Sequence, residues 1–280
     1  MTSISLRACQ HACLPVCVFA SMHVWQFLLS LSSADLTVGL AYGIYLSMTY
    51  TGFFELYTHQ ATRFVLCVLR TALMDVTLVV SVTNLLSITI DRWIAICHPL
   101  RYPTIVTDRR ANAAIGATWL WAVLFVVVPL LLWHSTEAIC SIEVFFNRYH
   151  MLAQCIYLLL LLAAMAALYA DIARVAKRHR QSIHARPSEE PAAMRRHHAL
   201  ATTRIFALVF GALVACVTPF YGVYTYLAMR GLDYTAPGFY WPTWLADVLW
   251  VANSWVNPAI YCWKYADFRR ALRTLLRREG

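Results

Sequence analysis

Six long apolar stretches constrain the fold of this chain more than any other feature of its sequence. They cover approximately residues 24–48, 64–90, 113–133, 151–170, 205–228 and 242–263. A helix crosses the roughly 30 Å hydrocarbon layer of a bilayer with about 20 apolar residues, so each stretch is long enough. Only 13% of the residues are charged, against about 25% in soluble domains. The sequence therefore predicts an all-α helical bundle that crosses a membrane about six times.

Positive charges gather in alternate loops. Lys and Arg residues follow the second, fourth and sixth stretches, the longest polar run being 179–198, whereas the other loops hold only Arg63, Arg148 and Arg230. Basic loops of membrane proteins remain in the cytoplasm, which predicts that both ends of the chain as written are cytoplasmic. This distribution accounts for the net charge of +9 without a nucleic-acid partner.

Polar side chains stand inside three of the apolar stretches. They are Asp35 in the first, Thr77, Ser81 and Asn84 in the second, and Asn253, Ser254 and Asn257 in the last. Small polar residues commonly hydrogen-bond between membrane helices, but that does not account for a carboxylate. An ionisable group at bilayer depth is costly and indicates a functional site.

Pro219 and Pro258 each interrupt a predicted span, and a proline inside a helix removes a backbone hydrogen bond and bends the helix. Bent helices with polar centres suit either a conformational switch or a transporter. A transporter is less favoured because the chain lacks paired broken helices in two related halves. An enzyme is not expected, since the His residues are scattered in loops without metal-ligand spacing.

The second apolar stretch has near its two ends residues that are predicted to lie at opposite faces of the membrane. Cys67 and Arg92 are 25 residues apart, about 37 Å along a helix. Cys67 and Cys140 are predicted at the outer ends, where disulfides persist. Asp91 and Arg92 fall at the cytoplasmic end, and in the simplest interpretation they form a solvated surface ion pair of little energetic value.

Taken together, these motifs resemble the rhodopsin-like (class A) receptors that couple to G proteins. The resemblance rests on SADL around Asp35, on Cys67, on the Asp91-Arg92-Trp93 triplet followed by HPLRY, on Trp119, and on CVTPF and NSWVNPAIY, in the family's order over residues 24–278. It implies a seven-transmembrane receptor of the plasma membrane, with helices two to seven present here and a heterotrimeric G protein as partner.

The resemblance also implies a role for each matching residue. A pocket for a sodium ion, which favours the inactive state, is implied for Asp35, Ser81, Asn253 and Asn257. Coupling to the G protein and the activation switch are implied for Asp91, Arg92, Leu100, Tyr169, Pro219, Asn257, Pro258 and Tyr261. An outer disulfide is implied between Cys67 and Cys140. No cofactor is expected apart from sodium.

Two of the departures from the family concern the activation switch. Val217 stands where these receptors commonly have the Trp of a CWxP motif, and Leu213 where they commonly have Phe. That pair usually transmits ligand contact to the kinked helix, so this chain lacks the family's usual means of agonist switching.

A finer resemblance concerns the ligand. GLAY, LRTALMDVTLVVSVTNLLSITIDR and LVFGALVACVTP are similar to segments of the lysophosphatidic acid and sphingosine-1-phosphate receptors. This implies a lysophospholipid, with membrane lipid as a partner, and a ligand site at Arg70, Thr71, Met74, Asp75 and Asp247 in which Arg70 grips the phosphate. One positive and two negative groups do not single out an anion, however. An amine or peptide ligand, or an orphan receptor active without ligand, remains open.

The first 23 residues fit this scheme least. Residues 10–22 are apolar but too short to span a bilayer, and Pro15 interrupts them. We expect an irregular segment over 1–23 in place of a first helix, the result of an incomplete gene model or a splice variant. A receptor domain is expected over 24–263, and a basic cytoplasmic helix and tail over 264–280. A truncated variant that does not signal is the alternative.

Overall fold

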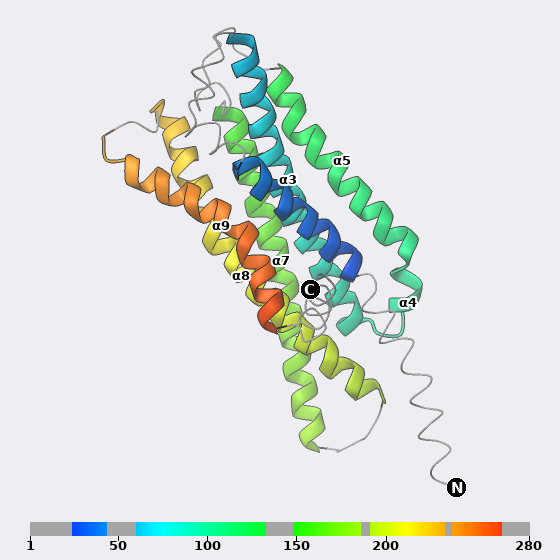
Figure 1. Ribbon diagram of the computed structural model, residues 1–280. Helices are drawn as coiled ribbons and strands as arrows, with labels where there is room; N and C mark the ends of the chain where they lie inside the picture. Colours follow the sequence, from blue (N-terminus) through cyan, green and yellow to red (C-terminus); the bar gives the residue numbers. More distant parts are fainter. Residues whose placement is uncertain (1–23, 44–59, 133–147, 186–190, 233–236, 265–280) are drawn as a thin grey trace, which may run out of the picture.

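The computed structural model describes residues 24–43, 60–132, 148–185, 191–232 and 237–264 of the chain (Figure 1). Side chains are described in these ranges except at 60–64, 66–68, 70, 130–131, 179–185 and 191–202. All regular secondary structure within the described ranges is helical. The prediction of an all-α bundle is confirmed.

The helices follow the order of the predicted spans. They are Val24–Gly43, α3 (Gln60–Cys97), α4 (Tyr102–Ile105), α5 (Asp108–Leu132), α7 (Arg148–Ala185), α8 (Pro191–Arg230) and α9 (Tyr240–Lys264). The polar run 179–198 is helical at both its ends, where α7 and α8 continue beyond the predicted spans. Its alanines and arginines favour helix in water, so the helices extend beyond the apolar stretches.

Within the described ranges, five helices are long and apolar enough to cross a membrane, namely Val24–Gly43 and the segments Thr71–Cys97, Asp108–Pro129, Arg148–Arg178 and Thr203–Arg230. The 25-residue α9 was predicted as the sixth span and is not among them. It carries Asp247, Asn253, Asn257 and five Trp, which lower its mean hydropathy. At 1.5 Å per residue it is still about 37 Å long, enough to cross the layer.

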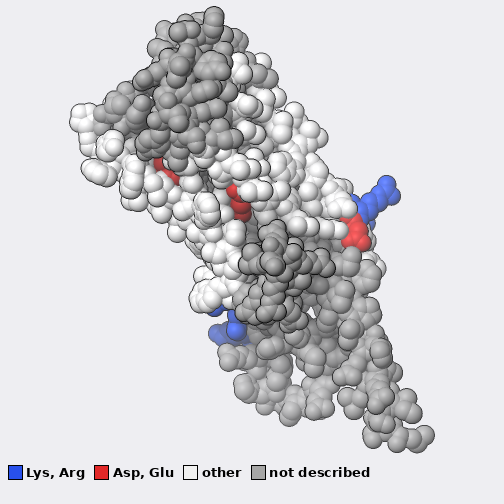
Figure 2. Space-filling view, viewed as in Figure 1, with Lys and Arg blue, Asp and Glu red and all other residues white. Residues whose placement is uncertain are grey.

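Helix α3 lies at the centre of the bundle. It packs against α5, α7 and α8, and α8 packs in turn against α9 (Figure 1). In an apolar 18-residue stretch of α3, 72% of the residues are buried, compared with 22% in the corresponding stretches of α5 and α7. Leucines and tryptophans on the outer helices are exposed, as expected where lipid covers them. Most of the described surface visible in Figure 2 is uncharged, with a few separate red and blue patches.

Local signals fix where two helices begin and end. The backbone N–H of Arg110 donates to the Thr107 hydroxyl at 3.4 Å, which caps the first turn of α5. Helix α8 ends at Arg230 because Gly231 adopts a φ of 63°, the left-handed conformation that commonly follows a helix.

Candidate functional site

A polar centre lies between the Val24–Gly43 helix, α3 and α9. The Asn257 side-chain amide donates to Asp35 Oδ2 at 3.1 Å, and Ser81 also interacts with the Asp35 carboxyl group. Asn253 is buried one helical turn before Asn257. The structure thus brings together three of the four residues of the implied sodium pocket and places the fourth on the same face of α9.

Several oxygens in this region lack a donor. Among the described residues, Asp35 Oδ1, Asn257 Oδ1 and Asn84 Oδ1 are buried without a hydrogen-bond partner. Leaving a buried acceptor unpaired costs free energy, and a bound cation removes that cost. Carboxylate and amide oxygens are hard ligands suited to alkali and alkaline-earth cations. The described part of the chain holds no group of three His, Cys, Asp or Glu residues that suits a transition metal.

A second hydrogen-bonded cluster joins three helices. The Ser30 hydroxyl oxygen accepts from the Asn84 amide at 2.8 Å and from the Trp119 indole N–H at 3.0 Å. Asn84 comes from α3 and Trp119 from α5, so Ser30 ties both to the Val24–Gly43 helix. Sequence reasoning did not single out Ser30, because a serine in a membrane helix carries little information by itself.

The cytoplasmic end of α3 holds a buried ion pair. Arg92 binds the Asp91 carboxylate through its Nε, at 2.9 Å, and through Nη2. Both side chains are at most 5% exposed, so the interpretation as a solvated surface pair was wrong. Tyr102 of α4 covers the pair and donates to Asp91 Oδ1 at 2.8 Å. Burial and the Asp91 carboxylate raise the pKa of Tyr102 well above its usual value, so the phenol keeps its proton.

The other predicted switch residues lie in α7, α8, α9 and the turn before α4. Tyr169 of α7 lies 3.4 Å from the Thr89 hydroxyl and packs on Phe210 of α8, with ring centroids 5.5 Å apart. Tyr261 is buried in α9. Leu100, in the turn before α4, is 94% exposed, which leaves it open to a partner in the cytoplasm. Pro219 and Pro258 lie inside α8 and α9 respectively.

Two carboxylates lie in the outer half of the bundle. Asp75 of α3 is 3% exposed and acts electrostatically on Tyr221 of α8. Its predicted neighbours Thr71 and Met74 are buried as well. Asp247 of α9 is half-buried and accepts a hydrogen bond from the Tyr224 hydroxyl at 2.9 Å.

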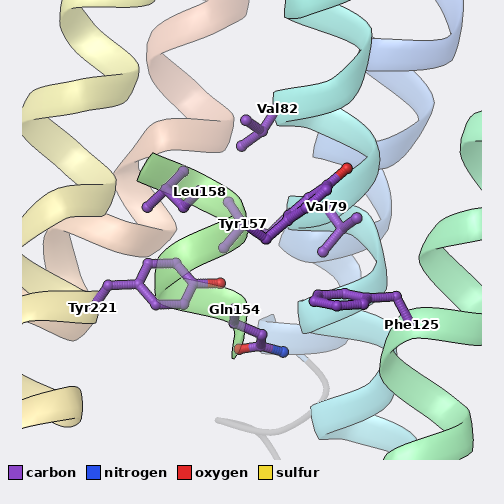
Figure 3. A pocket seen from close by; sticks show the side chains of 8 residues that line it. Val79, Val82, Phe125, Gln154, Tyr157, Leu158 and Tyr221 are labelled. Carbon is purple, nitrogen blue, oxygen red and sulfur yellow. The ribbon is translucent and has the colours of Figure 1, made fainter. Parts of the chain in front are cut away.

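A small pocket opens between α3, α5, α7 and α8. Its lining consists of Leu78, Val79, Val82, Phe125, Gln154, Tyr157, Leu158 and Tyr221. In Figure 3 the Tyr221 hydroxyl, the Gln154 amide and the Phe125 ring point toward one space. On α3, Asp75 lies one helical turn closer to the outer end of the bundle than the lining residues Leu78 and Val79.

One polar atom of the pocket wall has no donor. The Gln154 amide nitrogen lies 2.9 Å from His150 Nε2, and Gln154 Oε1 is buried without a hydrogen-bond partner among the described residues. Sequence reasoning did not identify Gln154 or Tyr221. Of the predicted disulfide pair, Cys140 lies outside the described residues, and the side chains of Cys67 and Arg70 are not described.

Comparison with known proteins supplies independent information. The family described as 7 transmembrane receptor (rhodopsin family) matches residues 14–261. The histamine H2 receptor of Canis lupus familiaris is 29% identical over 262 residues, which cover 90% of this chain and 69% of that receptor. The G-protein coupled receptor 3 of Rattus norvegicus is 29% identical over 87% of this chain and 69% of its own length. The human adenosine receptor A2b is 28% identical over 90% of this chain and 79% of its own length.

Proposed function

Because the chain belongs to the rhodopsin family of seven-transmembrane receptors, we propose that it binds a small cationic molecule in its outer half. Binding is passed to a heterotrimeric G protein at the cytoplasmic end. Members of this family are multi-pass plasma-membrane receptors and not enzymes. The receptor class follows from the family, whereas the cationic ligand is our proposal.

The buried carboxylate of Asp75 carries the proposal. An ionisable side chain at 3% exposure within a membrane helix indicates a functional site, and a carboxylate there attracts a cation. Asp75 acts on Tyr221, and Tyr221 lines the pocket, so a molecule there lies close to the carboxylate. An ammonium group held by Asp75 therefore places the rest of the ligand against the lining of the pocket, which must widen to admit it because the space there holds little more than a water molecule.

The pocket wall suits the remainder of such a ligand. Phe125, Tyr157 and Tyr221 offer aromatic rings, which attract cations and stack on planar groups. Gln154 Oε1 is a buried acceptor, and it favours a ligand with an N–H or O–H group at the end remote from its ammonium. A small aromatic amine combines these features.

The relatives support this choice over the lysophospholipid that the finer sequence resemblance implied. The name of the first relative contains histamine, a small aromatic amine, and the names of the other two contain no lysophospholipid. A lysophospholipid held by Arg70 is the second candidate. It is favoured only by the position of that arginine on α3, near the outer end of the bundle.

The two candidates give different results in one experiment. The full chain in lipid nanodiscs, mixed with purified heterotrimeric G proteins, is exposed to a panel of small aromatic amines, to lysophosphatidic acid and to sphingosine-1-phosphate. We expect at least one amine to accelerate nucleotide exchange on the G protein and both lipids to be inactive. Activation by a lysolipid alone would replace the amine proposal with the second candidate.

We also propose that the polar centre binds a sodium ion through Asp35, supported by Ser81, Asn253 and Asn257. The unpaired oxygens of Asp35 and Asn257 support this choice, since the ion supplies the missing positive partner. An ion that binds only the folded chain stabilises it, by about 1.4 kcal/mol at ten times the dissociation constant. In a chain of this size that raises the melting temperature by about 3–5 °C.

The Asp35→Asn variant tests the sodium site. We expect exchange of potassium for sodium at constant ionic strength to raise the melting temperature of the unaltered chain, and to leave that of the variant unchanged. Asp171→Asn is the matched control, because Asp171 is an exposed carboxylate paired with Arg174 and should retain the sodium response. Equal sodium shifts in the Asp35→Asn variant and the unaltered chain would exclude the site.

A further inference from the structure

A stacked pair of aromatic side chains joins α8 to α9. The rings of Phe220 and Trp250 have centroids 5.0 Å apart and lie 17° from parallel, and both side chains are buried. Aromatic pairs are favourable with centroids about 4.5–7 Å apart, so this is a well-formed contact. Each of the two helices also contains an internal proline.

On its outer side, Phe220 contacts two tyrosines, one that lines the pocket and one that binds Asp247. Its ring lies edge-on to Tyr221, with centroids 5.6 Å apart, and 4.5 Å from the ring of Tyr224. Tyr221 lines the pocket, and Tyr224 donates to Asp247 of α9. A molecule that enters the pocket therefore touches a side chain packed against Phe220.

On its inner side, the pair adjoins the kink and the polar centre. Pro219 directly precedes Phe220 and leaves the carbonyl of Ala215 without its helical hydrogen bond, so α8 bends easily here. Trp250 lies one turn before Asn253 and two turns before Asn257 on one face of α9, and Asn257 binds Asp35. The stack thus lies between the pocket and the polar centre.

The residues one and two turns inward from Phe220 on α8 are aliphatic. Val217 and Leu213 are fully buried in the apolar core at positions where rhodopsin-like receptors commonly carry the Trp and Phe that transmit ligand contact. Neither offers a flat ring that slides on a neighbour. The Phe220–Trp250 stack is the aromatic contact between α8 and α9 that lies beside the Pro219 kink in the described structure.

We propose that the Phe220–Trp250 stack transmits occupancy of the pocket to the Pro219 kink and to the polar face of α9, in place of the family's usual Trp. In the arrangement described here, the stack is intact and Arg92 is paired with Asp91. Phe220 and Trp250 are positioning residues that favour this arrangement, and displacement of Tyr221 weakens their contact. The inference rests on the receptor function proposed above but not on the identity of the ligand.

The test measures the position of α8 without any ligand. Spin labels are placed at the exposed positions Leu100 and Arg204 of the full chain, with Cys97 and Cys262 replaced by serine, and the distance between the labels is recorded in nanodiscs. We expect Phe220→Leu to raise the population of the longer distance about five-fold, equivalent to about 1 kcal/mol. Basal nucleotide exchange on the G protein should rise by the same factor.

Two variants serve as controls. Phe220→Tyr keeps the ring and should retain the original distances and basal exchange. Tyr226→Leu removes a different stack of α8, between Tyr226 and Phe239 with centroids 5.5 Å apart, and should also leave both readouts unchanged. A merely structural role for Phe220 would lower the melting temperature without changing the distances, and that result would overturn the proposal.

If Phe220→Leu does not fold, Trp250→Phe decides the matter. The smaller ring keeps part of the contact, so a smaller shift in the same direction is expected, and no shift would overturn the proposal. The outcome is independent of the ligand. Should no amine activate the chain while Phe220→Leu still moves α8, the amine proposal fails and the role of the stack stands.

Discussion

Arg92→Ala is expected to abolish activation of the G protein while leaving the chain folded in the membrane. Arg92 lies at the cytoplasmic end of α3, buried and bound to Asp91. The family resemblance implies that Arg92 leaves its carboxylate partner to meet the G protein, and alanine offers no group for that contact. Nucleotide exchange stimulated by the chain should fall to the level seen with empty nanodiscs.

Neighbouring variants distinguish this role from a loss of stability. Asp91→Asn weakens the ion pair and frees the arginine, so basal exchange should rise. Tyr102→Phe removes one hydrogen bond to Asp91, typically about 1 kcal/mol, and should raise basal exchange by a smaller factor. Arg109→Ala, at an exposed arginine on the same membrane face, should have no effect. Retained exchange in Arg92→Ala would contradict the assigned role.

The order of the long helices and five of the six predicted spans could be predicted because membrane helices are selected by apolar length. The ends of the helices could not be predicted in this way. The length of an apolar stretch depends on the thickness of the bilayer, whereas a helix can continue beyond the bilayer. Helices α7 and α8 therefore extend into water beyond the predicted spans 151–170 and 205–228. Helix α9 presents the opposite problem, because its polar centre makes it the least apolar of the predicted spans.

Asp35 could be identified from sequence because a carboxylate inside an apolar stretch is physically informative. Its contact with Asn257, which lies 222 residues away, follows from no local pattern and was implied only by the family resemblance. Gln154 stands in the apolar run LAQCIYLLL and could have been found by the reasoning applied to Asp35. Tyr221 could not, because an aromatic residue in a membrane helix is common whether or not it lines a pocket.

The burial of Asp91 and Arg92 was also beyond sequence reasoning. It depends on Tyr102, which α4 places over the end of α3, and nothing in the local pattern specifies that packing. A charged pair at the end of an apolar stretch is exposed by default. Here the pair is buried, and Tyr102 donates a hydrogen bond to Asp91.

Asp75→Asn is expected to reduce the potency of the most active amine by at least about 30-fold. Removing one partner of a buried charge pair costs about 2–5 kcal/mol, and about 1.4 kcal/mol corresponds to a factor of ten. Asparagine keeps the size of the side chain and its place beside Tyr221, so the change isolates the charge. Concentration–response curves for nucleotide exchange measure the effect.

Two matched variants assign the loss to Asp75 rather than to the outer half in general. Asp247→Asn alters a half-buried carboxylate already bound by Tyr224, and we expect it to change potency less than ten-fold, below about 1.4 kcal/mol. Arg70→Ala should leave the amine response intact, whereas it would abolish a response to a phosphate-bearing lipid. The opposite result, unchanged amine potency in Asp75→Asn and a large loss in Asp247→Asn, would contradict the assignment of the cation site to α3. The ammonium group would then be held by α9, beside Tyr224 instead of Tyr221.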